Sequence, residues 1–194
     1  MSGNPWTVAV TGASGGPYAV RLIETLAQAR VSVRLVVSSH GWRLLETETG
    51  IRSLEELTRA TGGDWSSIEV YDDTDRGATP ASGSARSAGM VICPCSMGTV
   101  AGIAAGASRS LVERAADVTL KERRPLILVP RETPLSLIHL RNLVALTEAG
   151  ATIMPAAPGF YHRPGRVEDL VDFIVQRILD HMGIAAEVVP RWRS

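Results

Sequence analysis

The chain has 194 residues, enough for one α/β domain with its own core, and we expect a single domain over 1–194. Its 20 Lys and Arg residues balance its 20 Asp and Glu residues, so charge gives no reason to expect binding to nucleic acid or to an anionic membrane. No apolar run approaches the roughly 20 residues that span a bilayer, and the N-terminal MSGNPWT lacks the charged and apolar parts of a signal peptide. These features predict a cytoplasmic protein.

Residues 8–18, VAVTGASGGPY, predict a short strand, a turn with three glycines and a helix that runs from Pro17 to about residue 30. The unpaired amides at the start of such a helix attract an anion, most simply a phosphate. The spacing G-A-S-G-G matches neither the dinucleotide fingerprint nor the Walker loop. An ordinary tight turn between strand and helix therefore remains the alternative.

The rest of the chain alternates between strand and helix patterns. We expect a helix opened by residues 96–99 and a short one that begins at a capping box of Ser53 and Glu56, with residues 72–88 as a long loop. The other predicted strands are 31–37, 68–71, 90–94, 125–130 and 151–154, and the other predicted helices are 41–49, 111–124, 135–149 and 167–182.

This alternation predicts a three-layer α/β sandwich, with helices on both faces of a mostly parallel sheet and ligands at the carboxyl ends of the strands. The turn after residue 94 is of the same kind as the first turn, so the two are placed to hold two ends of one ligand. Polar residues follow the predicted strands: Ser14, Ser38, Ser96, Thr99, Arg131, Glu132 and Tyr161.

Cysteine and histidine give no sign of a metal centre. Cys93 and Cys95 flank Pro94, a spacing that makes an internal disulfide improbable and supplies too few ligands for zinc, so we interpret both as small buried residues. The four histidines, at 40, 139, 162 and 181, show no metal-ligand spacing. We therefore expect no metal.

Six segments carry a resemblance to a known family. They are TGASG, PASGS, VICPCS, RAADVTLKERRPL, PRETP and APGFYHRP, and with them the chain resembles the UbiX-type flavin prenyltransferases (the UbiX/Pad family, formerly called aromatic acid decarboxylases) over residues 8–192. The resemblance implies a flavodoxin-like Rossmann fold that binds reduced FMN and a dimethylallyl phosphate, monophosphate or pyrophosphate. It also implies transfer of the prenyl group to N5 of the flavin and ring closure at C6.

The same resemblance implies partners. The prenylated FMN is passed to a separate UbiD-type decarboxylase, in ubiquinone biosynthesis or in aromatic acid breakdown. Family members are metal-independent and assemble as dodecamers with sites at subunit contacts, so we expect a homo-oligomer.

The resemblance also assigns site residues, one motif at a time. The residues implied to bind the cofactor are Gly12, Ala13, Ser14, Ser38, Ser96, Met97, Gly98, Thr99 and Arg131. Those implied to hold the prenyl phosphate are Lys121, Tyr161 and Arg177, together with Trp192 in a tail (185–194) that covers the site. The implied catalytic residues are Glu48, Ser14, Glu132 and Ser82, with Ser82 near the same flavin edge as Glu48.

The reaction gives reasons for these residue types. Breaking the bond between the allylic carbon and the phosphate leaves an anion, which Lys121, Arg177 and the Tyr161 hydroxyl can stabilise. Ring closure requires removal of the C6 proton, for which Glu48 or the retained phosphate is the candidate base, with Ser14 or Glu132 as a proton relay.

Without the resemblance, each of these residues has a plainer interpretation. Lys121 would lie at a solvated helix end, where a cation suits the dipole. Arg177 would lay its stem over an apolar helix, and Tyr161 would pack in a loop.

Two other functions stay open: an FMN-dependent decarboxylase of the phosphopantothenoylcysteine type, and a non-catalytic flavin carrier. The segment PASGSA, where that decarboxylase family has PASANT, counts against the first, and the set of predicted phosphate ligands counts against the second. Arg76 lies just before PASGS, where some prenyltransferases have Trp, so the lining of the prenyl pocket by this loop differs in this chain.

Overall fold

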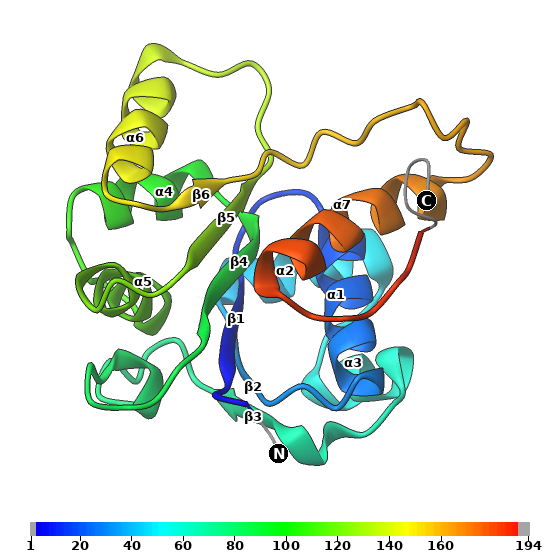
Figure 1. Ribbon diagram of the computed structural model, residues 1–194, viewed down its shortest axis with the longest axis horizontal. Helices are drawn as coiled ribbons and strands as arrows, with labels where there is room; N and C mark the ends of the chain where they lie inside the picture. The colour runs from blue at the N-terminus through cyan, green and yellow to red at the C-terminus, as the bar shows by residue number, and fades with distance from the viewer. Residues whose placement is uncertain (1–2, 190–194) are drawn as a thin grey trace.

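In the computed structural model, which describes residues 3–189, a single sheet of six parallel strands runs through the centre of the molecule (Figure 1). The strand order is β3-β2-β1-β4-β5-β6, the order of the classic doubly wound fold. The predicted mostly parallel α/β sheet is therefore confirmed. The strands are β1 (Trp6–Val10), β2 (Val33–Val37), β3 (Ile68–Tyr71), β4 (Gly89–Cys95), β5 (Leu126–Pro130) and β6 (Thr152–Ile153).

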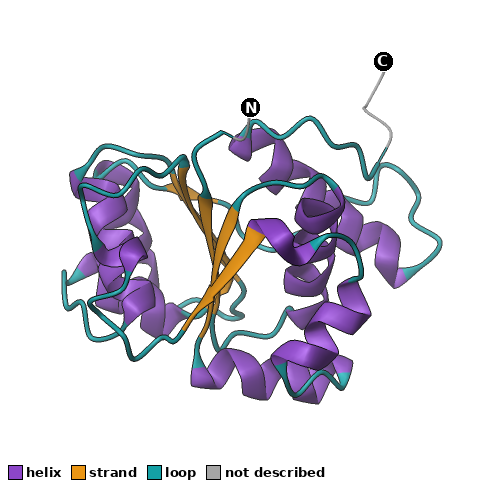
Figure 2. Ribbon diagram, turned by 90° about the horizontal axis from the view of Figure 1, so that it is seen from below, coloured by secondary structure: helices purple, strands orange, loops and turns teal. Residues whose placement is uncertain are grey.

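Helices cover both faces of this sheet (Figure 2), as the alternation predicts. One layer holds α1 (Gly16–Gln28), α2 (Ser39–Thr49), α3 (Leu54–Thr61) and α7 (Val167–Met182), and the other holds α4 (Met97–Ala104), α5 (Leu111–Lys121) and α6 (Leu137–Glu148). Two single turns of 3₁₀ helix, η1 (Trp65–Ser67) and η2 (Thr79–Ala81), flank β3. None of the helices in the described part of the chain is both long and apolar enough to cross a membrane.

The central strands are buried along their whole length, because helices cover them on both sides. Neighbouring residues of β1 point into opposite layers: Val8 packs into the core under α1 and α7, and Ala9 into the core under α4 and α5. Cys93 and Cys95 divide between the two cores in the same way, and burial raises the pKa of both thiols far above its ordinary value. Their interpretation as small buried residues is confirmed.

Several helices begin or end at residues other than the predicted ones, for local reasons. Helix α5 ends at Lys121 and not at residue 124, because Arg123 adopts a left-handed conformation with φ 57°. Helix α6 starts only at Leu137, after Ser136 caps it. The capping box predicted at α3 is half wrong: the Ser53 hydroxyl accepts from the Glu56 amide, but the Glu56 carboxylate accepts from the Arg52 amide in place of that of Ser53.

Candidate active site

The turns after β1 and β4 are bonded directly to each other. The amide and the hydroxyl of Thr11 both donate to the carbonyl of Pro94, each at 3.1 Å, and the Thr11 hydroxyl accepts from the Ser96 amide at 2.9 Å. Thr11 is buried, so water competes little for these bonds. The two turns predicted to hold one ligand are therefore fixed relative to each other.

The amides at the start of α1 are bonded to a carboxylate of the chain itself. Gly15, with φ 131°, and Gly16 donate their N–H groups to Oε2 of Glu48 at 2.9 and 2.7 Å. Glu48 lies in the last turn of α2, so the C-terminal end of α2 supplies the cap that α1 lacks. The amides that the glycine pattern predicts to attract a phosphate are therefore occupied by a glutamate of the chain itself.

Glu48 is held in its ionised form. Partial burial alone would raise the pKa of Glu48, but the bonds from Gly15, from the Ser14 hydroxyl and from Gly16, together with the charge of Arg131, lower it overall. The Arg131 guanidinium, which follows β5, donates to the carbonyl of Ser14 at 3.3 Å. Three residues assigned separately from the sequence, Ser14, Glu48 and Arg131, thus form one cluster.

Hydroxyl groups cap α2 and α4, which also begin at this edge of the sheet. Ser38 accepts from the Gly41 amide at 3.0 Å at the start of α2, and Ser96 accepts from the Thr99 amide at 3.1 Å at the start of α4. Met97 packs its side chain into the core under α4, so it offers no side chain to a ligand. Gly98 is exposed.

A cleft of about 380 Å³ opens between these two helix starts and the start of α5. Its lining includes Thr11, Gly12, Ser38, His40, Ser96, Gly98 and Thr99 from the three turns, and Asp73, Arg109, Ser110 and Glu113 from the opposite wall. Ala13, in the first turn, is buried and lies outside this lining.

The opposite wall contains residues that the sequence analysis missed. The Arg109 guanidinium pairs with Glu113 at 2.7 Å. The backbone carbonyl of Asp73 accepts from the Leu111 amide at 2.7 Å, and its carboxylate accepts from the Val112 amide at 2.9 Å. Burial opposes ionisation of Glu113, yet the bonds from Arg109 lower its pKa. The signal in the sequence was Ser110-Leu-Val-Glu113, a capping pattern at the start of a helix.

The predicted prenyl phosphate ligands Tyr161 and Arg177 lie in a separate region. Arg177, on the exposed side of α7, pairs with Asp180 at 2.9 Å. Tyr161 is exposed in the loop before α7 and packs its ring against those of His162 and Phe173, with centroids 4.5 and 5.6 Å away.

Glu132 and Arg76 do not join the cluster around Glu48. Glu132 is exposed, and its carboxylate accepts from the amide of Thr133 at 3.0 Å. Arg76 is exposed in the loop after β3. Trp192 and residues 190–194 of the predicted tail lie outside the described residues.

Lys121 and Ser82 lie together, but at the other edge of the sheet. Lys121 ends α5 just before β5 begins, whereas Ser14 and Arg131 follow the carboxyl ends of their strands. Ser82 bonds to the Ser84 hydroxyl at 3.0 Å, and a side chain at the intervening Gly83 would meet Nζ of Lys121 at 2.8 Å. A single copy of the chain therefore does not bring Ser82 or Lys121 to Glu48.

Among residues 3–189, no group of three or more His, Cys, Asp and Glu side chains is arranged to hold a metal ion. The polar groups at the cleft include hydroxyls, backbone amides, the His40 ring, the Asp73 carboxylate and an Arg–Glu pair. Helix N-termini with hydroxyl caps suit a phosphate and carbonyl oxygens.

Comparison with known proteins agrees with this chemistry. The family model described as Flavoprotein matches residues 1–179. The flavin prenyltransferase UbiX of Pseudomonas aeruginosa is 49% identical over 193 residues, which cover 96% of this chain and 92% of that protein. The crystal structure of AnUbiX in complex with FMN and dimethylallyl pyrophosphate is 39% identical, with a TM-score of 0.90 over 98% of both chains. A dodecameric FMN-dependent UbiX-like decarboxylase from Escherichia coli is 42% identical, with a TM-score of 0.87 over 98% of this chain and 99% of that one.

Proposed function

The chain belongs to the UbiX family of flavin prenyltransferases, and we propose that it transfers a dimethylallyl group from dimethylallyl phosphate to N5 and C6 of reduced FMN. The observation that carries the proposal is the cleft between the starts of α2, α4 and α5, next to the cluster of Ser14, Glu48 and Arg131. Its volume of about 380 Å³ lies within the range of small-molecule sites.

The residues present fit FMN. Hydroxyl-capped starts of α2 and α4, at Ser38 and Ser96, offer N–H and O–H donors to a phosphate or to flavin carbonyl groups. The amides of Gly15 and Gly16 are bonded to Glu48, so we place the FMN phosphate at α2 and α4 and the reacting edge of the flavin near Glu48. Bound FMN supplies the nucleophilic atoms of the reaction.

Glu48 and the departing phosphate have different roles in the proposed reaction. A good base has a pKa close to the working pH, and the lowered pKa of Glu48 makes it a poor proton acceptor. The departing group is a free phosphate dianion, which accepts a proton close to neutral pH and so suits this task better. We therefore assign ring-closure base to the retained phosphate, and to Glu48 the role of a fixed anion that stabilises the cationic allylic fragment, with Ser14 and Glu132 as proton relays.

We assign binding of the prenyl phosphate to Arg177 on α7, to Tyr161 in the loop before that helix, and to Lys121 at the end of α5. Within one chain, Lys121 lies at the amino ends of the strands and Arg131 at their carboxyl ends. We therefore propose that Lys121, together with Ser82, completes the site of another copy. This proposal requires a homo-oligomer, with a dodecamer as in the Escherichia coli relative.

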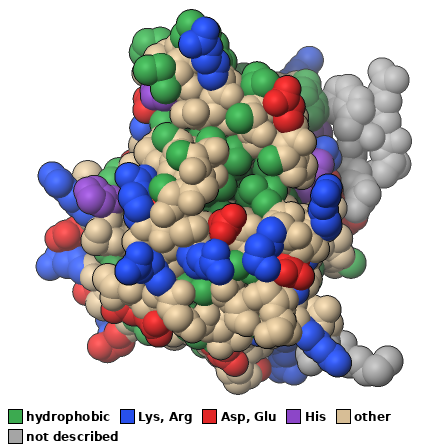
Figure 3. Space-filling model, turned by 90° about the vertical axis from the view of Figure 1, so that its left-hand side faces the viewer, with side chains coloured by type: hydrophobic (Ala, Val, Ile, Leu, Met, Phe, Trp, Pro, Cys, Tyr) green, Lys and Arg blue, Asp and Glu red, His purple; other side chains and the backbone are tan. Residues whose placement is uncertain are grey.

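The surface of α6 supports assembly. In the described chain it exposes Leu137, Ile138 and Val144 by 60, 68 and 57%, and such a row of apolar side chains is typical of an interface. Figure 3 shows hydrophobic side chains at the top of the molecule, on the side where α6 lies, beside a Lys or Arg side chain, with further Lys and Arg side chains below.

The product, prenylated FMN, would leave for a UbiD-type decarboxylase that uses it as cofactor, in the cytoplasm. Ubiquinone biosynthesis and aromatic acid breakdown are the two settings in which such a decarboxylase acts. The donor is a dimethylallyl phosphate, either the monophosphate or the pyrophosphate that the AnUbiX complex contains.

The test is anaerobic incubation of the purified protein with reduced FMN and dimethylallyl phosphate, followed by mass spectrometry of the released flavin. We expect a gain of one C5H8 unit, which Arg177→Ala and Tyr161→Phe abolish. Arg59→Ala is the matched control, because Arg59 also pairs with a carboxylate on its own helix but lies on α3, away from the cleft. Unmodified FMN with both the monophosphate and the pyrophosphate would contradict prenyl transfer and favour a flavin carrier or a decarboxylase.

A further inference from the structure

After α7 the chain turns back and runs along the helix that it has just left (Figure 1). Gly183 ends α7 in a left-handed conformation with φ 70°, and the amide of Ile184 donates to the carbonyl of Leu179 at 3.0 Å. Residues 184–188 then pass beside the middle of α7, where Ile184, Ala186 and Val188 pack against the core. We call residues 184–189 the return segment.

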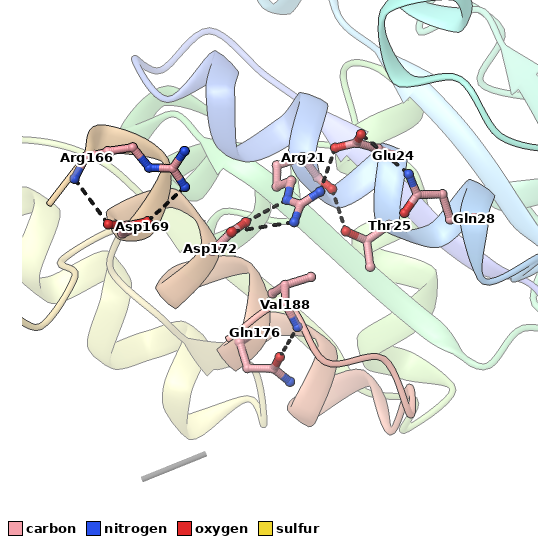
Figure 4. Close-up of polar contacts among 9 residues, drawn as sticks. All are labelled: Arg21, Glu24, Thr25, Gln28, Arg166, Asp169, Asp172, Gln176 and Val188. Atoms are coloured by element: carbon pink, nitrogen blue, oxygen red, sulfur yellow. Dashed lines mark hydrogen bonds and ion pairs between the residues drawn. The ribbon is translucent and has the colours of Figure 1, made fainter. Parts of the chain in front are cut away.

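One side chain, that of Gln176, fastens the return segment to α7. Its Oε1 accepts from the amide of Val188 at 2.8 Å, and its Nε2 donates to the carbonyl of Ala186 at 3.2 Å (Figure 4 shows the Val188 bond). Gln176 is only 5% exposed although it is polar. A buried amide that satisfies two backbone groups of another segment determines where that segment lies.

The same amide is linked to the predicted phosphate ligand Arg177 through the carboxylate of Asp180. Nε2 of Gln176 donates to Oδ1 of Asp180 at 3.0 Å, and Oδ2 of the same carboxylate accepts from Arg177 at 2.9 Å. Asp180 thus lies between the guanidinium and the return segment. Because a carboxylate held on one side by Gln176 has fewer accessible rotamers, it limits the orientations of Arg177 on the other side.

The return segment also borders the loop that carries Tyr161. Val188 and Val189 line one side of a cavity of about 340 Å³, and Gly159, His162 and Pro164 of that loop line another, with Phe173 of α7 between them. His162 and Phe173 are the two rings that pack against Tyr161. The segment fastened by Gln176 and the loop that carries Tyr161 thus share one cavity, while Asp180 pairs with Arg177.

We propose that Gln176 is a positioning residue for the prenyl donor: it holds the return segment in place and, through Asp180, sets the direction of Arg177. This inference rests on the proposed function, since Tyr161 and Arg177 bind phosphate only there. It assigns Gln176 no contact with FMN or with the reacting atoms. Donor binding should depend on Gln176, and FMN binding should not.

The chain offers a matched control, because it has two glutamines and both are drawn in Figure 4. Gln28 lies at the exposed end of α1 and its amide reaches only Glu24 on its own helix, at 3.5 Å. Gln176→Met and Gln28→Met remove the amide at nearly constant volume. Asp180→Asn is the third variant, since it keeps the shape of the carboxylate but removes its charge.

Three readouts are measured on the assembled protein: the FMN dissociation constant, KM and kcat for dimethylallyl phosphate, and amide hydrogen exchange of residues 184–189. For Gln176→Met we expect exchange in the return segment to rise about tenfold or more, KM for the donor to rise at least as much, and FMN affinity to stay within about twofold. Gln28→Met should match the parental protein in all three. Asp180→Asn should raise the donor KM without changing exchange at Val188.

Two results would overturn the inference: unchanged exchange and donor KM in Gln176→Met, or an equal loss of FMN and donor affinity, which would indicate general loss of structure. Failure of the proposed function is distinguishable from both. In that case the parental protein makes no prenylated flavin at all, while the exchange measurement still reports whether Gln176 holds the return segment.

Discussion

At the scale of single residues, Glu48 determines how the first turn works. Its carboxylate takes the two amides that the glycine pattern exposes, so the positive end of α1 is already compensated before a ligand arrives. The starts of α2 and α4 have only neutral serine caps. The difference in charge favours a phosphate at these two helices.

We predict that Glu48→Gln retains most of the structure and FMN affinity, because a glutamine oxygen still accepts from Gly15 and Gly16. With phosphate as the base, product formation should slow by less than about 100-fold, the low end of what loss of a general base costs. Mass spectrometry of the flavin during single-turnover reactions measures this. A larger loss, with a flavin product other than the ring-closed one, would make Glu48 the base.

The effect of Glu48→Gln on stability should depend on pH. Because folding lowers the pKa of Glu48 below its ordinary 4.5, the ionised carboxylate adds stability above that pH, and the addition disappears as pH falls through the lowered value. The difference in melting temperature between the parental protein and Glu48→Gln should therefore stay constant from pH 8 to about 5 and shrink below about pH 4.5. A difference that grows on acidification would show that the pKa is raised.

At the scale of elements, the serine caps serve both the fold and the cleft. We predict that Ser96→Ala costs about 1 kcal/mol of stability, as loss of an N-cap does, and also weakens FMN binding about five- to tenfold. Ser53→Ala is the control, since Ser53 caps α3 by the same bond and lies outside the cleft. Thermal unfolding and flavin fluorescence, measured at one protein concentration, separate the two effects.

Two outcomes would count against this dual role. If Ser53→Ala weakened FMN binding as much as Ser96→Ala, the effect would come from lost helix stability alone. If Ser96→Ala bound FMN normally despite a lower melting temperature, the cap would serve only the fold.

The order and kind of the elements could be predicted from the sequence, because buried parallel strands have continuous apolar runs and the helices have apolar stripes. Their ends could not be predicted so well. Helix α5 ends before Arg123 because that residue is left-handed, and the sequence has no glycine there to indicate a helix end. The wall of the cleft around Arg109 and Glu113 was missed because Asp73 lies in the loop after β3 and the other two lie at the start of α5. These two segments form one surface only after folding.

At the scale of the whole molecule, the assigned site residues divide between two edges of the sheet. The motifs identify Lys121 and Arg131 equally well, and the predicted elements place Lys121 before β5 and Arg131 after it, at opposite ends of that strand. The fold separates them within one chain, so the proposed site requires assembly. Which surface pairs with which depends on exposed side chains such as those of α6, where many sequences fit equally well.

We predict that Lys121→Ala and Arg131→Ala are each inactive, but that co-expression of the two chains restores activity. In randomly mixed oligomers about a quarter of the sites would combine an intact Lys121 from one copy with an intact Arg131 from another. The assay is prenylated FMN formed per chain, with separately purified, unmixed variants as the control. No recovery in mixed oligomers would mean that one chain supplies the whole site.

The burial of both cysteines also has a practical consequence for studying that assembly. Cys93 and Cys95 are fully enclosed in the two cores, and their raised pKa leaves almost no thiolate at neutral pH, so maleimide and iodoacetamide reagents have nothing to react with in the folded chain. Thiol labelling of the protein without added cysteines should therefore give no background signal. A single cysteine introduced on α6 would carry a fluorophore or spin label alone, and its spectrum would report directly how neighbouring copies approach.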